Sequence, residues 1–104
     1  MEMIVLWTDS AIEDLREIHD YLFSEASLKV ANKITDSIVD KTILHEKTPR
    51  IGQVEELLKH RKEEIRYIID GHYKIVYVID GNYLIITTVF DCRQDPKKLE
   101  DTKI

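Results

Sequence analysis

The chain has few of the residues that mark disulfides, metal sites and membrane segments. Cys92 is the one cysteine among 104 residues, so an internal disulfide cannot form, and cysteine and histidine do not cluster with metal-ligand spacing. The apolar run from Met3 to Trp7 is much shorter than the roughly 20 residues of a membrane-spanning helix, and it lacks the pattern of a signal peptide. We therefore expect a cytoplasmic protein with no membrane segment, no metal and no cofactor.

Positive charge is scarce in the first half of the chain. Residues 1–48 contain 5 Lys and Arg against 10 Asp and Glu, a balance of −5, whereas residues 49–104 contain 10 of each and balance to zero. The net charge of −5 therefore comes from the first half. Such a chain does not attract nucleic acid through its overall field, so any phosphate chemistry requires a local basic patch in the second half.

The first half has the period of helices. Ser10 followed by Glu13 has the pattern of a capping box at a helix N-terminus. A short break at 24–27 separates this predicted helix from a second one over residues 28–46. Apolar residues of the first helix recur along one stripe, formed by Ala11, Leu15, Ile18 and Leu22, with Ile12, His19 and Phe23 beside it.

The second half changes to the alternation of strands. Three runs are rich in Ile, Val and Tyr, at residues 65–70, 73–80 and 83–90. Asp70-Gly71 and Asp80-Gly81-Asn82 join them and are strong β-hairpin signals. We therefore predict a single α+β domain over residues 1–104, in which an N-terminal strand and a helical hairpin pack on a small, mainly antiparallel, four-stranded sheet.

Both faces of the predicted sheet are apolar. The helices can cover one face only, so we expect the C-terminal tail, a second copy of the chain or a dedicated partner to cover part of the other. Val39 and Ile43 lie on the far side of the second predicted helix and are candidates for a partner interface. In the last two strands, Tyr73, Ile75, Tyr77 and Ile79 alternate with Lys74, Val76 and Val78, and Leu84, Ile86 and Phe90 alternate with Tyr83, Ile85 and Val89.

Three segments carry a resemblance to a known family. They are "WTDSAIEDLREIHDYL" at 7–22, "LHEKTPRIG" at 44–52 and "RYIIDGHYKIVYVIDGNYLIITTVFDCRQDPKKL" at 66–99. In this order and spacing they resemble the RelE/ParE superfamily of bacterial type II toxins, over nearly the whole chain. The resemblance implies a helical hairpin on a twisted antiparallel sheet. It also implies a partner, a small antitoxin whose extended and helical segments wrap around the toxin.

The superfamily includes two activities, and the basic residues bear on which one applies. RelE-like members are ribosome-dependent, metal-free ribonucleases, which need a base, cations around the phosphate and an acid for the leaving oxygen. On that resemblance the catalytic candidates are Arg66, Lys74 and Arg93. Lysine at 74 stands where such enzymes commonly carry arginine, and it lacks the bidentate fork. No Tyr or His follows Tyr83 to act as the terminal acid, so the ribonuclease set is incomplete.

The resemblance therefore favours a ParE-like toxin that acts on DNA gyrase and is neutralised by a cognate antitoxin. A RelE-like ribonuclease that acts on mRNA at the ribosome is the alternative, and a non-toxic interaction domain that has kept the fold is a third reading. A simpler role for Arg93 is an ion pair with Asp91 or Asp95, and residues 59–62 suit a solvated loop. The basic candidates for contact with a target or phosphate are Lys59, Arg61, Arg93, Lys97 and Lys98.

Overall fold

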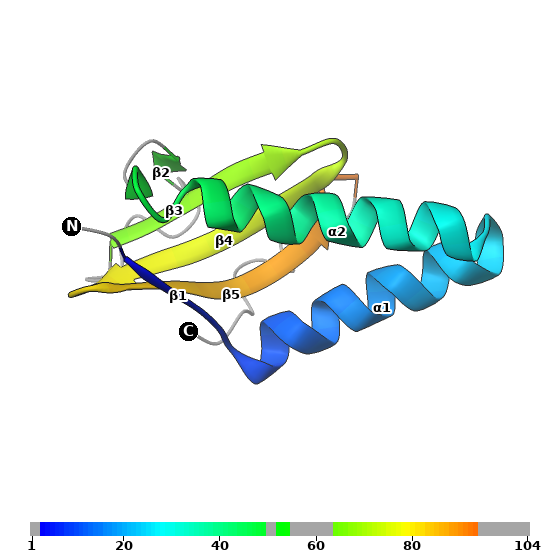
Figure 1. Cartoon of the computed structure of the whole chain (residues 1–104), viewed down its shortest axis with the longest axis horizontal. Coiled ribbons are helices and arrows are strands. Elements are labelled where there is room, and N and C mark those ends of the chain that lie inside the picture. Colours follow the sequence, from blue (N-terminus) through cyan, green and yellow to red (C-terminus); the bar gives the residue numbers. More distant parts are fainter. Residues whose placement is uncertain (1–2, 50–51, 55–63, 94–104) are drawn as a thin grey trace.

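Two antiparallel helices lie on one face of a five-stranded mixed sheet in the computed structural model of the chain (Figure 1). The structure describes residues 3–49, 52–54 and 64–93. The strand order is β1-β5-β4-β3-β2, with β1 parallel to β5 and the other pairs antiparallel. The elements are β1 (Ile4–Trp7), α1 (Asp9–Glu25), α2 (Leu28–Leu44), β2 (Gln53–Val54), β3 (Glu64–Asp70), β4 (Tyr73–Asp80) and β5 (Tyr83–Asp91).

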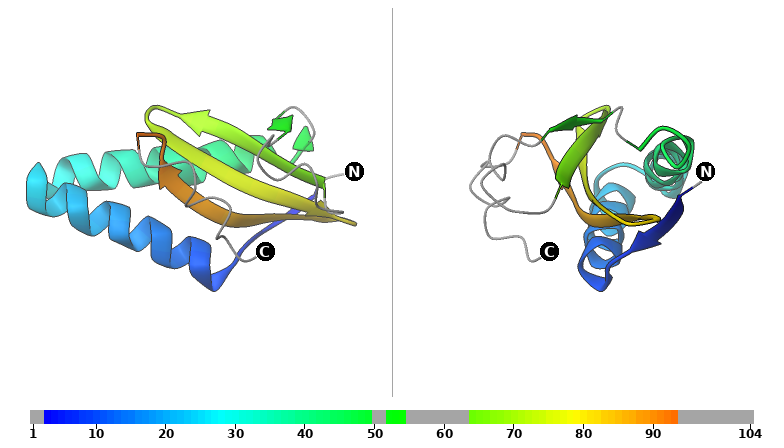
Figure 2. Two further views of the ribbon diagram at one scale, coloured as in Figure 1. Left: turned by 180° about the vertical axis from the view of Figure 1, so that it is seen from behind. Right: turned by 90° about the vertical axis from the view of Figure 1, so that its left-hand side faces the viewer.

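This architecture confirms the predicted α+β class and the place of the N-terminal strand in the sheet. Seen along its long axis, the molecule carries both helices on the same side of the sheet (Figure 2). The short strand β2 is an addition to the prediction. It has two residues and pairs with Tyr67 and Arg66 of β3, so it is too short for any alternation to reveal it.

Helix α1 begins two residues earlier than the sequence predicts, and the expected capping box at Ser10 is wrong. Thr8 is the N-cap, because its Oγ1 accepts a hydrogen bond from the backbone N–H of Ala11 at 3.1 Å. The backbone N–H of Thr8 donates to the carbonyl of Ile86 in β5 at 3.0 Å. Pairing with β5 thus fixes where the extended chain ends, which leaves Ser10 inside the first turn of α1.

The helical hairpin closes through a short turn. Ser27 caps α2, with its Oγ accepting from the backbone N–H of Val30 at 3.1 Å. His19 Nε2 and Asn32 Oδ1 lie 2.7 Å apart and link the two helices side by side. Among the described residues, neither helix is long and apolar enough to cross a membrane.

Two glycines make the tight turns of the β3–β4 and β4–β5 hairpins. Gly71 and Gly81 have φ of 61° and 57°, a conformation that glycine adopts without steric cost. Each is the first residue of a two-residue loop, the position of glycine in a type II′ turn. The Asp-Gly hairpin signals are therefore confirmed.

One extra residue in β5 changes which side chains reach the helices. The pairing of β4 with β5 shifts between Val76 and Tyr77, so Thr87 has no partner in β4 and forms a β-bulge. Beyond the bulge the alternation is reversed. Val89 packs in the helix-side core, and Phe90 packs on the opposite face. Strict alternation along the strand predicts Phe90 on the helix side and Val89 on the opposite face, and this prediction is wrong.

The sheet carries an apolar cluster on each face. The cluster away from the helices consists of Ile65, Val76 and Val78, with Tyr67 and Phe90 packed against it. The expected second apolar face is therefore present. Its central residues, Val76 and Val78, are buried even though neither helix lies on that face. The helix-side cluster contains Ala11, Ile38, Ile68, Tyr73, Ile75, Tyr77, Leu84, Ile86 and Val89.

A carboxylate of α1 holds the bulged strand. Asp14 Oδ2 accepts a hydrogen bond from the backbone N–H of Val89 at 3.1 Å. Burial raises the pKa of Asp14, the hydrogen bond from Val89 opposes that change, and the nearby Glu17 and Glu13 raise the pKa further. The ionised carboxylate is thus partly desolvated and repelled by its neighbours, while its oxygen still fills a hydrogen-bonding role.

Two substitutions of Asp14 distinguish the contribution of its hydrogen bond to stability from the contribution of its charge. Asp14→Asn keeps an acceptor for the Val89 N–H and removes the repelled charge, so its free energy of unfolding at neutral pH is expected to equal or exceed that of the parent. Asp14→Ala leaves the N–H without this acceptor and is expected to cost about 1–3 kcal/mol. Urea denaturation of the three proteins measures both effects.

The pH dependence of stability gives a second test of the Asp14 charge. The pKa of Asp14 in the folded chain lies above its ordinary 3.8, so the stability that this group contributes at low pH is lost as pH rises from 3.8 through the raised pKa. Asp14→Asn is expected to lack this loss. A parent chain that is clearly more stable than Asp14→Asn at neutral pH would contradict the argument.

Candidate functional site

Just after β5, Arg93, which is a candidate from the sequence both for catalysis and for contact with a target, lies beside an acidic partner. Arg93 Nε lies 2.9 Å and 3.1 Å from the two carboxylate oxygens of Asp91, and Arg93 Nη2 lies 2.5 Å from Asp91 Oδ2. The backbone N–H of Arg93 also donates to Asp91 Oδ1 at 2.9 Å. The guanidinium is exposed, and its fork binds a carboxylate of its own chain. The structure thus shows the simpler role, an ion pair with Asp91.

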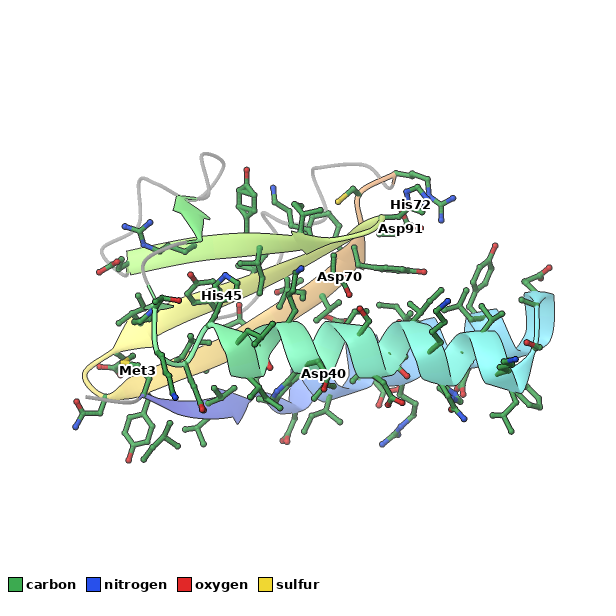
Figure 3. The ribbon with its side chains drawn as sticks, turned by 45° about the horizontal axis from the view of Figure 1, so that its top comes forward. Met3, Asp40, His45, Asp70, His72 and Asp91 are labelled. Carbon is green, nitrogen blue, oxygen red and sulfur yellow. The ribbon has the colours of Figure 1, made fainter. Side chains whose placement is uncertain are left out.

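The two charges at this strand end stabilise each other. The side-chain hydrogen bond from Arg93 lowers the pKa of Asp91 to about 2, burial opposes that change, and His72 contributes a smaller lowering. His72 and Asp91 lie next to each other at the end of the sheet (Figure 3). The pKa of Tyr73 is raised by burial first and by Asp91 second. Because Asp91 stays ionised far below neutral pH, it neutralises Arg93 under physiological conditions.

Lys74 lies on the face of the sheet away from the helices. Its Nζ is 4.0 Å from the centre of the Tyr67 ring, which is a cation–π contact. It pairs across the sheet with Phe90, which belongs to the same face. The lysine therefore packs over an aromatic side chain of the neighbouring strand β3.

Arg66 lies on the opposite face from Lys74. Its cross-strand partner is Tyr77, a residue of the helix-side core. Arg66 Nη1 donates to the carbonyl of Gly52 at 2.6 Å, and Arg66 Nε donates to Glu64 Oε2 at 2.9 Å. The structure does not bring Arg66 and Lys74 together, because the two side chains project from different sides of the sheet.

Gly52, whose carbonyl accepts the hydrogen bond from Arg66, lies in a tight corner after α2. The hydroxyl of the buried Tyr77 donates to the carbonyl of Pro49 in the same corner. A Cβ at position 52 would collide with that hydroxyl and would lie 2.9 Å from the carbonyl oxygen of Tyr67. Arg66 therefore stabilises the chain where β2 begins.

The other basic candidates, Lys59, Arg61, Lys97 and Lys98, lie outside the described residues. Their proposed contacts with a target or phosphate stay predictions. Within residues 3–49, 52–54 and 64–93, no group of three or more His, Cys, Asp and Glu side chains could hold a metal ion.

The interface candidates on α2 differ in exposure. Val39 is half-buried, and Ile43 is exposed. Other large apolar side chains of the helical hairpin are also exposed and were not among the interface candidates: Ile12, Tyr21, Phe23, Leu28 and Leu44. A signal was available, because Ile12 and Phe23 are separated by about three helical turns and so share one side of α1, away from its buried stripe.

Comparison with known proteins gives one family. Residues 5–96 match the family model for the ParE toxin of the type II toxin–antitoxin system parDE. No curated protein matches the chain.

Three solved structures illustrate the similarity in fold. The chromosomal ParDE system from P. aeruginosa matches with a TM-score of 0.73 at 17% identity, over 86% of this chain and 96% of that chain. The toxin–antitoxin complex RelBE2 from Mycobacterium tuberculosis matches with a TM-score of 0.62 at 20% identity, over 88% of this chain and 99% of that one. An arginine double mutant of the E. coli toxin RelE in the free state gives 0.60 at 11% identity, over 89% and 86%. The expected fold is therefore confirmed.

Removing the side chain of Arg93 tests whether its hydrogen bonds lower the pKa of Asp91. In Arg93→Ala the pKa of Asp91 is expected to rise from about 2 toward 3.8, because the hydrogen bonds that favour the carboxylate are lost. The parent should then lose more stability than the variant as pH falls from 3.8 to about 2. An NMR titration of the Asp91 carboxyl carbon measures the pKa.

The matched control for this titration is Arg16→Ala. It removes another exposed arginine, which pairs with Glu13 on α1 at 3.1 Å, and it should leave Asp91 unchanged. An Asp91 pKa that stays near 2 in Arg93→Ala would show that another group holds the carboxylate ionised.

Proposed function

This chain belongs to the ParE family of type II toxin–antitoxin toxins, and from that premise we propose that it inhibits DNA gyrase in the cytoplasm until a cognate antitoxin neutralises it. The family match spans most of the chain and supports the toxin role. The choice of gyrase over RNA as the target rests on the placement of the basic side chains.

One observation carries that choice. A metal-free ribonuclease site needs cations that converge on a single phosphate. Arg66 and Lys74 project from opposite faces of one sheet, so one phosphate cannot contact both. The fork of Arg93 is already filled by Asp91. The contacts of these three residues are therefore better suited to stabilising the sheet and its strand ends than to cleaving RNA. This arrangement favours a toxin that acts by binding a protein.

Exposed apolar side chains support the antitoxin partner. Ile43 is about half exposed on α2, and apolar groups in a contiguous patch mark protein interfaces. Val39 lies one helical turn before it, so the two share a side of the helix. One structure of similar fold, RelBE2 from Mycobacterium tuberculosis, is a toxin–antitoxin complex. By this proposal, Val39 and Ile43 contact the antitoxin.

Expression of the chain alone in bacteria tests the target. Gyrase inhibition blocks chromosome replication, so cells are expected to stop dividing, grow as filaments and induce their response to DNA damage. The purified chain is expected to inhibit supercoiling of plasmid DNA by purified gyrase. Microscopy, a DNA-damage reporter and the supercoiling reaction read out these effects.

A core variant provides the control, and two outcomes would refute the proposal. Ile38→Asp places a charge in a fully buried position, so it is expected to unfold the chain and abolish every effect. Rapid arrest of translation with codon-linked cuts in mRNA would identify a ribonuclease instead. A folded parent chain with no effect on growth or on gyrase would identify a non-toxic interaction domain.

A further inference from the structure

The ion pair after β5 differs from another exposed ion pair, that of Arg16 with Glu13 on α1. The side chains of Arg93 and Arg16 are both 64% exposed. Glu13 is 53% exposed, and its Oε2 lies 3.1 Å from Arg16 Nη1. Asp91 is only 18% exposed, and Arg93 binds it through Nε at 2.9 Å and 3.1 Å and through Nη2 at 2.5 Å. The carboxylate of Asp91 is therefore packed into the strand end, whereas the guanidinium that it binds lies at the surface.

The backbone orients the Asp91 carboxylate toward this guanidinium. The backbone N–H of Arg93 donates to Asp91 Oδ1 at 2.9 Å, which is the hydrogen bond of an Asx turn. The N–H of Cys92 donates to the carbonyl of His72 at 2.6 Å and fixes the chain beside the β3–β4 turn, where His72 and Asp91 lie next to each other (Figure 3). Asp91 also pairs across the sheet with Tyr73, a residue of the helix-side core. The carboxylate is thus held in place by its own strand as well as by Arg93.

An anion from outside has to compete with this carboxylate for the guanidinium. Arginine binds a phosphate or a carboxylate through the same fork of parallel N–H donors. Because Asp91 stands two residues before Arg93, its effective concentration at the fork is on the order of millimolar or higher. An anion that displaces it also leaves a mostly buried carboxylate without its cation, which costs free energy. A phosphate group at lower concentration therefore does not displace Asp91.

We infer that Asp91 determines the ligand specificity of this strand end, by acting as an internal anion that keeps phosphate groups off the guanidinium of Arg93. Once Asp91 is neutralised, the Nε and Nη2 donors that it now occupies become available to a phosphate group. The inference concerns a ligand that the strand end excludes, so it does not depend on whether the target of the toxin is gyrase.

Two other roles for the ion pair lead to different results. If Asp91 and Arg93 only stabilise the strand end, removal of the charge loosens the chain there and creates no affinity for phosphate. If the guanidinium exchanges freely between Asp91 and water, as in many surface ion pairs, phosphate binds equally well with and without the carboxylate. Only an internal anion that excludes others predicts a gain of phosphate binding when its charge is removed.

Asp91→Asn removes the charge and keeps the shape of the side chain. The amide oxygen can still accept from the backbone N–H of Arg93, so the turn after β5 is retained. The probe is inorganic phosphate, titrated at constant ionic strength, and the readout is the NMR signal of the Arg93 Nε–Hε group. The dissociation constant for phosphate is expected to be about fivefold lower, or less still, in Asp91→Asn than in the parent. Without phosphate, exchange of Hε with water is expected to be roughly tenfold faster in the variant.

Glu13→Gln is the matched control, because it removes the same charge beside an equally exposed arginine. Since Glu13 is itself exposed, phosphate binding at the Arg16 Nε–Hε group is expected to change by less than about twofold. The double variant Asp91→Asn with Arg93→Ala is expected to lose the gain, read from the backbone N–H signal of Cys92. Circular dichroism and a thermal melt confirm that each variant is folded. If Asp91→Asn is unfolded, Asp91→Ser repeats the test, because a serine hydroxyl can also accept the hydrogen bond of the turn.

Three results would overturn the inference. Faster exchange of the Arg93 Hε with unchanged phosphate affinity would show an ion pair that is only structural. A parent that binds phosphate as tightly as Asp91→Asn would show that Asp91 excludes nothing. A gain that survives the loss of Arg93 would assign the phosphate to other cations. None of these results bears on gyrase, which the supercoiling reaction tests separately.

Discussion

The arrangement of both sheet faces depends on the bulge in β5. Because Thr87 has no partner in β4, the side-chain alternation reverses after it, so that Val89 enters the core beneath the helices and Phe90 packs on the other side. Two residues after Thr87, the backbone N–H of Val89 donates a hydrogen bond to the carboxylate of Asp14 in α1 at 3.1 Å. One added residue therefore decides which side chains fill two cores and where a helix is fastened to the sheet.

Much of the fold could be predicted because its determinants are local. The bounds of β4 match the alternating run 73–80, and the glycines of the two hairpins have the backbone conformation that their turns require. The predictions are wrong where the local sequence allows two structures equally well and contacts with residues far along the chain decide between them. Thr8 and Ser10 are both suitable caps, and only the pairing of β1 with β5 selects Thr8. A bulge likewise leaves little trace in a run of β-branched residues.

The site was harder to predict, although part of the information was present. A two-residue turn after Asp70 pairs Arg66 with Tyr77, which by itself puts Arg66 and Lys74 on opposite faces. Matching residues to the superfamily by position overlooked this register. The pairing of Arg93 with Asp91 depends on how the chain turns after β5, which composition does not encode. Local patterns locate charged residues along the chain better than they show which of them meet.

The parallel pairing of β1 with β5 also has a consequence for synthesis of the protein. Thr8 and Thr87, which are in contact at the end of this pair, are 79 residues apart in sequence. The first strand is translated early, yet its neighbour in the sheet is translated only after the helical hairpin, β3 and β4. Contacts of such long range form slowly, and β1 cannot pair with β5 until β5 has been made. A ribosome that stalls before β5 therefore leaves β1 without the strand that it pairs with, and leaves the backbone N–H of Thr8 without its acceptor on Ile86.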